Sequence, residues 1–247
     1  MPSRRLVASS LLAALVSSLV VAASPSAAAP PKFVQKSFSF RSPDGKVLHA
    51  SVGGFGSLRP RPVIVEDSPY SPDVNTLSWL GTSYNYVELQ WRGTGLSQGA
   101  LSTTGPADQR DLSAFLGWTC RQPWSSGKLG YYGFSASAIV AYNTMHLPMP
   151  CVKAAALMAG SVDLYRDLLD IGGIPNLAAG AYVEAAIGAP TLLASGQRLH
   201  DDPASSPETL LGYPRAAVDV LSHTTEDAFW RQRTFRGDRD RIPILAD

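Results

Sequence analysis

Lys128-Leu129-Gly130-Tyr131-Tyr132-Gly133-Phe134-Ser135-Ala136-Ser137-Ala138 is the stretch of sequence that decides the fold. Its apolar first half is typical of a buried strand, and residues 136–146 follow with apolar positions at helical spacing. A strand, a sharp turn with Ser135 at its apex and then a helix is the geometry of a nucleophile elbow. The pattern here is G-x-S-x-S, because Ser137 replaces the usual second glycine. The alternative is a buried strand that feeds a helix, with Ser135 acting only as the N-cap.

The composition is that of an ordinary globular protein. The chain has 247 residues, a net charge of +1 and 45% hydrophobic residues, which is enough for one good-sized core or for one core with a small cap. A charge this close to neutral gives no reason to expect nucleic acid or an acidic surface as a partner. The arginines between Arg231 and Arg241 are interleaved with Asp238 and Asp240, and we interpret them as a solvated helix face.

The first 29 residues have the features of a secretory signal peptide. Arg4 and Arg5 form a positive n-region, residues 6–23 form an apolar h-region, and the small residues 26–29 form a cleavage site. We expect cleavage near Ala28-Ala29 and a secreted, extracellular protein with no membrane attachment. The alternative is an uncleaved anchor, because the h-region is almost long enough to span a bilayer.

Two cysteines stand on either side of the elbow. Cys120 ends a predicted helix, and Cys151 opens the strand that follows the elbow helix. Both are expected at the end of the sheet opposite the nucleophile, so a Cys120–Cys151 disulfide fits an oxidising compartment. Such a loop contributes roughly 3–4 kcal/mol in the chain-entropy model. Two buried free thiols are the alternative.

Short apolar strands alternate with helical segments along the first 160 residues. This alternation is typical of an α/β protein with a mostly parallel sheet covered on both faces. We expect strands over residues 33–40, 47–52, 62–66, 84–90, 128–134 and 152–158, and helices over residues 105–120 and 136–146.

The pattern changes after residue 160. Residues 163–169, 175–187 and 207–230 are predicted to be helical, without interleaved strands. We interpret residues 161–240 as a cap inserted over the carboxyl ends of the strands, where ligands bind in α/β sheets. The remaining boundaries are a signal peptide at 1–29, a core at 30–160 and the start of a returning core strand at 241–247. A chain that stops inside a core strand leaves a sheet edge unpaired, so we expect these residues to be the front part of a longer or truncated protein.

Five short motifs follow one another between residues 63 and 247. They are Ser68-Pro69-Tyr70, the R-G-T-G-L-S-Q-G loop at 92–99, the segment 118–135 that leads to the elbow, Ser161-Val162-Asp163-Leu164-Tyr165, and residues 223–231 with Asp227-Ala228-Phe229-Trp230. In this order they resemble the cocaine-esterase-like and X-prolyl dipeptidyl-peptidase group of serine hydrolases. The resemblance implies an α/β-hydrolase fold with an inserted helical cap, of which this chain would be the N-terminal part of the catalytic domain.

The resemblance also implies roles for three residues. Ser135 would be the nucleophile that attacks an acyl carbonyl. The backbone N–H of Ala136 would be one oxyanion donor, as elbow geometry requires, and the Tyr70 hydroxyl would be the other. The alternative for Tyr70 is an aromatic ring that packs on a proline-rich turn. We expect the loop at 92–99 to shape a turn rather than to touch substrate.

The chain departs from the family pattern in two places. Ser68 stands where the family has an asparagine before the proline. The family's triad aspartate and histidine lie beyond the strand that residues 241–247 begin, so this chain is expected to lack them. Asp247 falls short of the acid position, and we interpret Asp163 as a helix cap. Structural or surface roles are the better interpretation of the four histidines, which are His49, His146, His200 and His223.

Together these features predict a secreted serine hydrolase that cleaves an ester, amide or X-prolyl peptide bond through an acyl-enzyme on Ser135. Its substrate would be a small-molecule ester or amide, or a short peptide, and nothing in the sequence indicates a metal or organic cofactor. The alternative is a truncated, non-catalytic, hydrolase-like domain that only binds a ligand or partner. The sequence favours neither esters nor peptides and indicates no oligomeric state.

Overall fold

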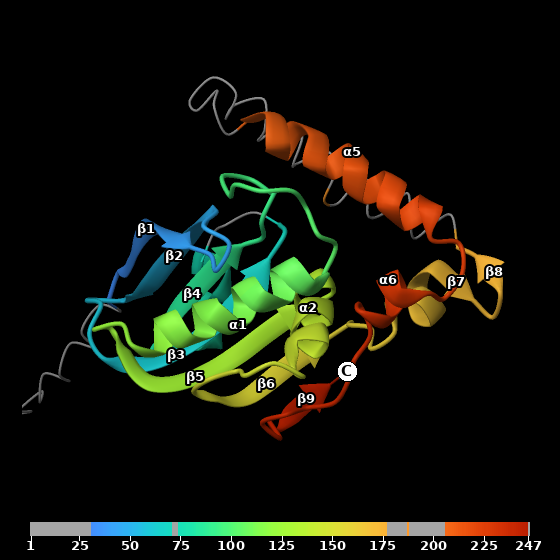
Figure 1. The fold of residues 1–247 in the computed structure, drawn as a ribbon. Coiled ribbons are helices and arrows are strands. Elements are labelled where there is room, and N and C mark those ends of the chain that lie inside the picture. Colours follow the sequence, from blue (N-terminus) through green and yellow to red (C-terminus); the bar gives the residue numbers. More distant parts are fainter. Residues whose placement is uncertain (1–30, 71–73, 177–186, 188–205, 247) are drawn as a thin grey trace, which may run out of the picture. The chain divides into compact units, whose positions relative to one another are not determined.

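A seven-stranded sheet is the frame of the protein in the computed structural model, which describes residues 31–70, 74–176, 187 and 206–246 (Figure 1). The order across the sheet is β1-β2-β4-β3-β5-β6-β9. Only the β1–β2 and β2–β4 pairings in this sheet are antiparallel, and the other four are parallel. The strands are β1 (Phe33–Arg41), β2 (Val47–Phe55), β3 (Arg61–Ser68), β4 (Asn85–Gln90), β5 (Ser125–Phe134), β6 (Val152–Met158) and β9 (Ile244–Ala246).

The antiparallel edge of the sheet is a hairpin formed by the strands predicted at residues 33–40 and 47–52. β1 and β2 pair from Phe33↔Phe55 to Arg41↔Val47. The turn between them is stabilised by the Ser42 hydroxyl, which donates to the Asp44 carboxylate at 2.5 Å. Gly45 closes the turn with a φ of 86°, a left-handed conformation that glycine adopts without steric cost.

Helices cover both faces of the sheet within the described residues. α1 (Pro106–Cys120) and α2 (Ala136–Thr144) lie over one face (Figure 1), and η1 (Val74–Leu80) packs against the other. Successive side chains of β4 point to opposite faces of the sheet. Val87 belongs to the main core with α1 and α2, while its neighbour Tyr86 packs with η1. Fully buried residues of the main core include Val63, Val65, Leu89, Leu112, Phe115, Leu116 and Val140.

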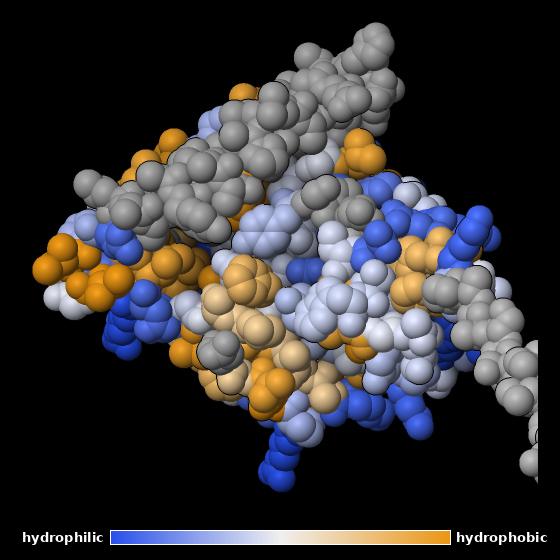
Figure 2. Space-filling model, turned by 180° about the vertical axis from the view of Figure 1, so that it is seen from behind, coloured by the Kyte–Doolittle hydropathy of each residue, from blue (hydrophilic) through white to orange (hydrophobic). Residues whose placement is uncertain are grey.

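The face opposite α1 and α2 carries exposed apolar surface. Seen from behind, apolar side chains gather over this side of the molecule (Figure 2). Exposed large apolar side chains in the described part of the chain include Trp79, Phe134 and Leu245. Leu245 lies on β9, the edge strand of the sheet.

The segments that follow β6 differ in part from the prediction. A short π-helix, η2 (Tyr165–Leu169), leads into a hairpin of β7 (Asp170–Ile171) and β8 (Ile174–Pro175). The expectation of a block without strands was therefore wrong, because Gly172 and Gly173 both adopt positive φ and allow a tight turn that the helical pattern did not reveal. Most of the helix predicted over residues 175–187 lies outside the described residues.

The helix predicted over residues 207–230 is divided in two. α5 (Ser206–Ser222) ends before His223, and α6 (Ala228–Arg231) begins after Asp227. The Asp227 carboxylate accepts a hydrogen bond from the backbone N–H of Phe229 at 2.8 Å, so this residue acts as an N-cap that starts a new helix.

The arginine-rich stretch is also not a solvated helix face throughout. Arg233 is buried, and its guanidinium donates to the backbone carbonyls of Ser102, Thr103 and Phe229 at 2.9–3.1 Å. A buried guanidinium with several carbonyl partners orders the loop that it contacts. Arg233 therefore ties the segment after α6 to the loop before α1, a role that charge patterning alone did not suggest.

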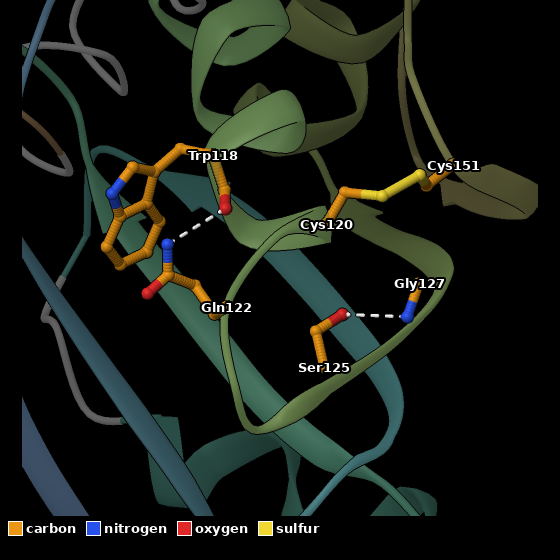
Figure 3. Close-up of a disulfide and its surroundings, with 6 residues drawn as sticks. All are labelled: Trp118, Cys120, Gln122, Ser125, Gly127 and Cys151. Carbon is orange, nitrogen blue, oxygen red and sulfur yellow. Dashed lines mark hydrogen bonds between the residues drawn. A yellow bond between two sulfur atoms is a disulfide. The ribbon is translucent and has the colours of Figure 1, made fainter.

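The two cysteines form a disulfide in the structure, with their Cα atoms 6.1 Å apart (Figure 3). Cys120 is the last residue of α1, and Cys151 directly precedes β6. The chain around the bridge is also ordered by hydrogen bonds, because the Gln122 side chain donates to the Trp118 carbonyl at 3.0 Å and the Gly127 N–H donates to the Ser125 hydroxyl at 3.2 Å (Figure 3). The bridge thus joins a core helix to a core strand.

The described residues after Pro30 belong to one compact unit. The predicted signal peptide, at 1–29, lies outside the described residues and stays a prediction. Among the helices that the structure describes, none combines the length and the apolar character needed to cross a membrane. The proposed boundary between core and cap at residue 160 also remains a prediction.

Replacing both cysteines by serine should lower the free energy of unfolding by roughly 3–4 kcal/mol, because the bridge constrains a segment with a sequence separation of 31 residues in the unfolded state. Urea unfolding of the variant and of the oxidised native protein measures the difference. The native protein treated with a reductant is the matched control and should unfold at the same urea concentration as the double variant. Equal stability of the oxidised and reduced native protein would contradict the prediction.

Candidate active site

Ser135 sits at a sharp turn between β5 and α2, as the elbow motif predicts. Its backbone has φ 55° and ψ −117°, a left-handed region that costs a non-glycine residue about 1–3 kcal/mol. The turn is held at both sides, because the Ser135 N–H donates to the Met158 carbonyl on β6 and the Ser135 carbonyl accepts from the Ala138 and Ile139 N–H groups, at 2.9–3.0 Å. A strained serine that the surrounding structure fixes in this way is typical of a functional site.

Small residues make the turn sterically possible. A Cβ on Gly133 would lie 2.8 Å from the backbone of Ala138, and a Cβ on Gly160 would lie 2.8 Å from the Ala138 side chain. Glycine is therefore required where β5 and β6 meet the first turn of α2. Ser137, which replaces the second glycine of the motif, is fully buried. The turn forms with a serine at this position.

Tyr70 and Ala136 come together beside the nucleophile, although they are 66 residues apart in the sequence. The Ala136 N–H donates to the Tyr70 hydroxyl oxygen at 3.4 Å. Because that oxygen accepts this bond, the hydroxyl hydrogen is left to donate elsewhere. A neutral bond of this length is weak, so a negatively charged oxygen between the two donors would be the stronger acceptor.

The loop that carries Tyr70 is shaped by Ser68, the residue that stands in place of the family's asparagine. The Ser68 hydroxyl accepts a hydrogen bond from the Tyr70 N–H at 3.2 Å. A serine side chain that bonds the backbone two residues later forms a turn similar to that of asparagine. The departure from the family motif is thus compatible with the same kind of turn.

Acidic residues at the end of β3 lie close to the elbow, although no sequence motif indicated them. Glu66 and Asp67 are buried, and Glu66 lies opposite the buried Glu88 in the β3–β4 register. Burial raises the pKa of Glu66 to about 7, an effect that the nearby Ser137 hydroxyl partly offsets. Burial, together with the carboxyls of Asp108 and Asp111, raises the pKa of Asp67 well above its usual value. Two adjacent acidic residues directly after the apolar run at 63–65 are the signal that would have found this group.

The glycine-rich loop at 92–99 begins with a buried arginine that pairs with two carboxylates. The Arg92 guanidinium donates to the Asp111 carboxylate on α1 at 2.8 Å and to the Asp44 carboxylate in the β1–β2 turn at 2.9 Å. Burial alone would lower the pKa of Arg92, but Asp44 and Asp111 raise it above its usual value. Gly93 has φ 69°, and a Cβ on it would lie 2.4 Å from the backbone of Leu101. Arg92, through its ion pairs, and Gly93, through its backbone conformation, therefore shape the loop.

Each histidine in the described residues has partners that other elements or its own segment supply. His49 lies on β2, and its backbone N–H donates to the Ser97 hydroxyl at 2.9 Å. His146 Nδ1 lies 2.8 Å from the Asn143 carbonyl, and burial together with Arg236 lowers the His146 pKa. His223 Nδ1 lies 2.5 Å from the carboxylate of Asp227, while His200 lies outside the described residues.

Asp163 also acts locally, because its carboxylate accepts from the Arg166 N–H at 3.1 Å. In the part of the chain that the structure describes, no three acidic, histidine or cysteine side chains are grouped so as to hold a metal ion. Asp247 lies outside the described residues.

The chain is similar to known proteins both in sequence and in fold. The model of the X-Pro dipeptidyl-peptidase (S15) family matches residues 44–246. Cocaine esterase from Rhodococcus sp. (strain MB1 Bresler) is 26% identical over 116 residues, which cover 43% of this chain and 20% of that protein.

Two solved structures resemble the chain over most of its length. A CocE/NonD family hydrolase from Staphylococcus aureus superposes with a TM-score of 0.66 and 21% identity, covering 83% of this chain and 38% of its own. An alpha-amino acid ester hydrolase superposes with a TM-score of 0.63 and 17% identity, covering 94% of this chain and 45% of its own. The predicted α/β-hydrolase fold is confirmed, and the chain spans less than half the length of each of these three relatives.

Replacing Glu66 by glutamine should change how stability depends on pH. The pKa of Glu66 lies at about 7 in the folded protein against an ordinary 4.5, so the folded state favours the protonated carboxyl. Its stabilising contribution is present below pH 4.5 and is lost as the pH rises towards 7. Glu66→Gln stays neutral, so its free energy of unfolding relative to the native protein should rise by on the order of 3 kcal/mol between pH 4.5 and about 8.

Urea unfolding at a series of pH values measures this difference. Glu226→Gln, which removes a carboxyl at the surface that pairs with Arg166, controls for the change of one charge. A stability difference for Glu66→Gln that is independent of pH would contradict the prediction.

Proposed function

The chain belongs to the X-Pro dipeptidyl-peptidase (S15) family, and we propose that it carries the nucleophile and the oxyanion hole of a secreted serine hydrolase. In this proposal the Ser135 hydroxyl attacks the acyl carbonyl of an ester, amide or X-prolyl peptide and forms an acyl-enzyme. The Ala136 N–H and the Tyr70 hydroxyl donate to the oxyanion of the tetrahedral intermediate. The activity proposed is that of the whole native protein.

The observation that carries the proposal is the convergence of three groups at one turn. Ser135 has the left-handed backbone that exposes a nucleophile between a strand and a helix. The next residue in the chain supplies an N–H group, and that N–H lies 3.4 Å from the Tyr70 hydroxyl oxygen. A serine that served only as a helix cap would not account for a phenol from another loop beside it.

The names of the similar proteins bear on the substrate class. One is named a cocaine esterase, one an alpha-amino acid ester hydrolase, and the family model is that of X-Pro dipeptidyl-peptidases. All three names describe cleavage at an acyl carbon, which is the chemistry that a serine nucleophile and an oxyanion hole supply. We therefore propose a small ester or amide, or a short peptide, as the substrate of the native protein.

The proposed nucleophile predicts a covalent adduct. The native protein, purified from culture medium, should react with a fluorophosphonate probe, and peptide mapping should place the label on Ser135. Ser135→Ala should not be labelled, while Ser125→Ala, in which the changed serine lies at the other end of the same strand, should be labelled as the native protein is. Intact mass measured on the same sample shows which polypeptide carries the label. A folded native protein that is not labelled would support a non-catalytic binding domain instead.

The proposed oxyanion donor predicts a kinetic defect. Tyr70→Phe removes one donor to the developing oxyanion, so kcat for a chromogenic short-chain ester should fall about 100- to 1000-fold. KM should change little, because the ground-state carbonyl carries little negative charge. Tyr84→Phe, in the smaller core beside η1, is the matched control and should leave kcat unchanged. Equal kcat values for the native protein and Tyr70→Phe would show that Tyr70 only packs against its loop.

A further inference from the structure

Tyr131 is a buried tyrosine beneath the elbow whose hydroxyl joins two different elements. It lies on β5, four residues before Ser135, and its side chain packs in the main core. The hydroxyl oxygen accepts a hydrogen bond from the backbone N–H of Asp67 at 3.3 Å. The same hydroxyl donates to the backbone carbonyl of Ser137 at 2.9 Å.

In the sequence, each of these two partners lies within three residues of one of the proposed oxyanion donors. Asp67 is three residues before Tyr70, and Ser137 directly follows Ala136. Backbone pairing between β3 and β5 ends at Val65↔Tyr131, so the strand that leads to Tyr70 continues past that point without a ladder to β5. The Tyr131 hydroxyl extends the connection across this gap and reaches the first turn of α2.

We propose that Tyr131 is a positioning residue for the oxyanion hole, whose hydroxyl holds the start of the Tyr70 loop against the first turn of α2. This inference rests on the proposed function. The donors of an oxyanion hole come here from two separate elements, and such groups must be held within about 0.5 Å of their working geometry. A single hydroxyl bonded to the backbone of both elements sets their separation directly.

The surroundings of the Tyr131 hydroxyl favour its protonated form. Burial, together with the carboxyls of Asp67 and Glu66, raises the pKa of Tyr131 well above its usual value. The phenol therefore remains a donor to the Ser137 carbonyl and an acceptor for the Asp67 N–H. Phenylalanine at this position preserves the packing of the ring and removes only the two hydrogen bonds.

The test is Tyr131→Phe in the native protein, assayed with a chromogenic short-chain ester and with a fluorophosphonate probe. We expect kcat to fall about ten-fold with KM unchanged, a smaller loss than the 100- to 1000-fold effect of deleting a donor. The rate of fluorophosphonate labelling should fall to a similar extent, because negative charge develops on the phosphoryl oxygen in the hole as the serine attacks phosphorus, before fluoride leaves. Each kcat value is calculated per molecule of active protein, whose fraction is the fraction that the probe labels at completion. Misfolded protein therefore does not lower the kcat value.

Tyr86→Phe is the matched control for a structural effect. Tyr86 is fully buried, and its hydroxyl donates to the Gly81 backbone carbonyl beside η1, so this variant loses a comparable hydrogen bond in the smaller core. Both variants should be destabilised to thermal unfolding, whereas only Tyr131→Phe should lose kcat. Tyr131→Met, a flexible apolar residue that also lacks the hydroxyl, should show the same loss of kcat and provides the test if the phenylalanine variant does not fold.

The outcomes separate this inference from the proposed function. A native protein that is labelled on Ser135, with kcat unchanged in Tyr131→Phe or reduced equally in Tyr86→Phe, would overturn the positioning role alone. A native protein that is not labelled at all would overturn the proposed function and the positioning role together. A selective loss of kcat in both Tyr131 variants would support the inference.

Discussion

The backbone at Ser135 takes a left-handed turn, and much of the surrounding structure is arranged around that turn. A β-strand that runs directly into a helix must reverse its direction within one residue, which forces a positive φ on a serine. Gly133 and Gly160 provide the space, since a side chain on either would collide with Ala138. The Met158 carbonyl on β6 accepts the Ser135 N–H, so the neighbouring parallel strand also supports the turn. Local strain at one residue is thus balanced by packing and hydrogen bonds from several elements.

Polar groups lie directly beneath this turn, where an ordinary core would be apolar. Tyr131, Asp67 and Glu66 are buried at the carboxyl end of β3 and β5. Burying such groups is costly unless hydrogen bonds compensate, and the Tyr131 hydroxyl is bonded to two backbone groups. A polar layer of this kind fixes the relative position of strand ends more sharply than apolar packing, because hydrogen bonds are directional.

Two buried arginines order the loops around the site in a similar way. Arg92 joins the glycine-rich loop to α1 and to the β1–β2 turn through Asp111 and Asp44. Arg233 joins the segment after α6 to the loop before α1 through backbone carbonyls. The buried charge of Arg92 penalises every arrangement that leaves it without its carboxylates, and the buried guanidinium of Arg233 penalises every arrangement that removes its carbonyl acceptors. Both arginines therefore specify how connections that are distant in the sequence meet.

The sequence by itself determined the strand order along the chain, the elbow at Ser135 and the α/β class with a mostly parallel sheet, because periodicity, turn residues and small residues act locally. The α/β-hydrolase fold was expected from the family resemblance. It failed at the β7–β8 hairpin, at the break between α5 and α6 and at Arg233, where glycine turns, a capping aspartate and long-range partners override a helical pattern. Tyr70 was expected beside the elbow only through the family resemblance. Its approach to Ala136, the bridging hydroxyl of Tyr131 and the buried acids of β3 depend on strands that pair in parallel across long loops. Only the tertiary structure decided these contacts, since no local pattern encodes which strand ends meet.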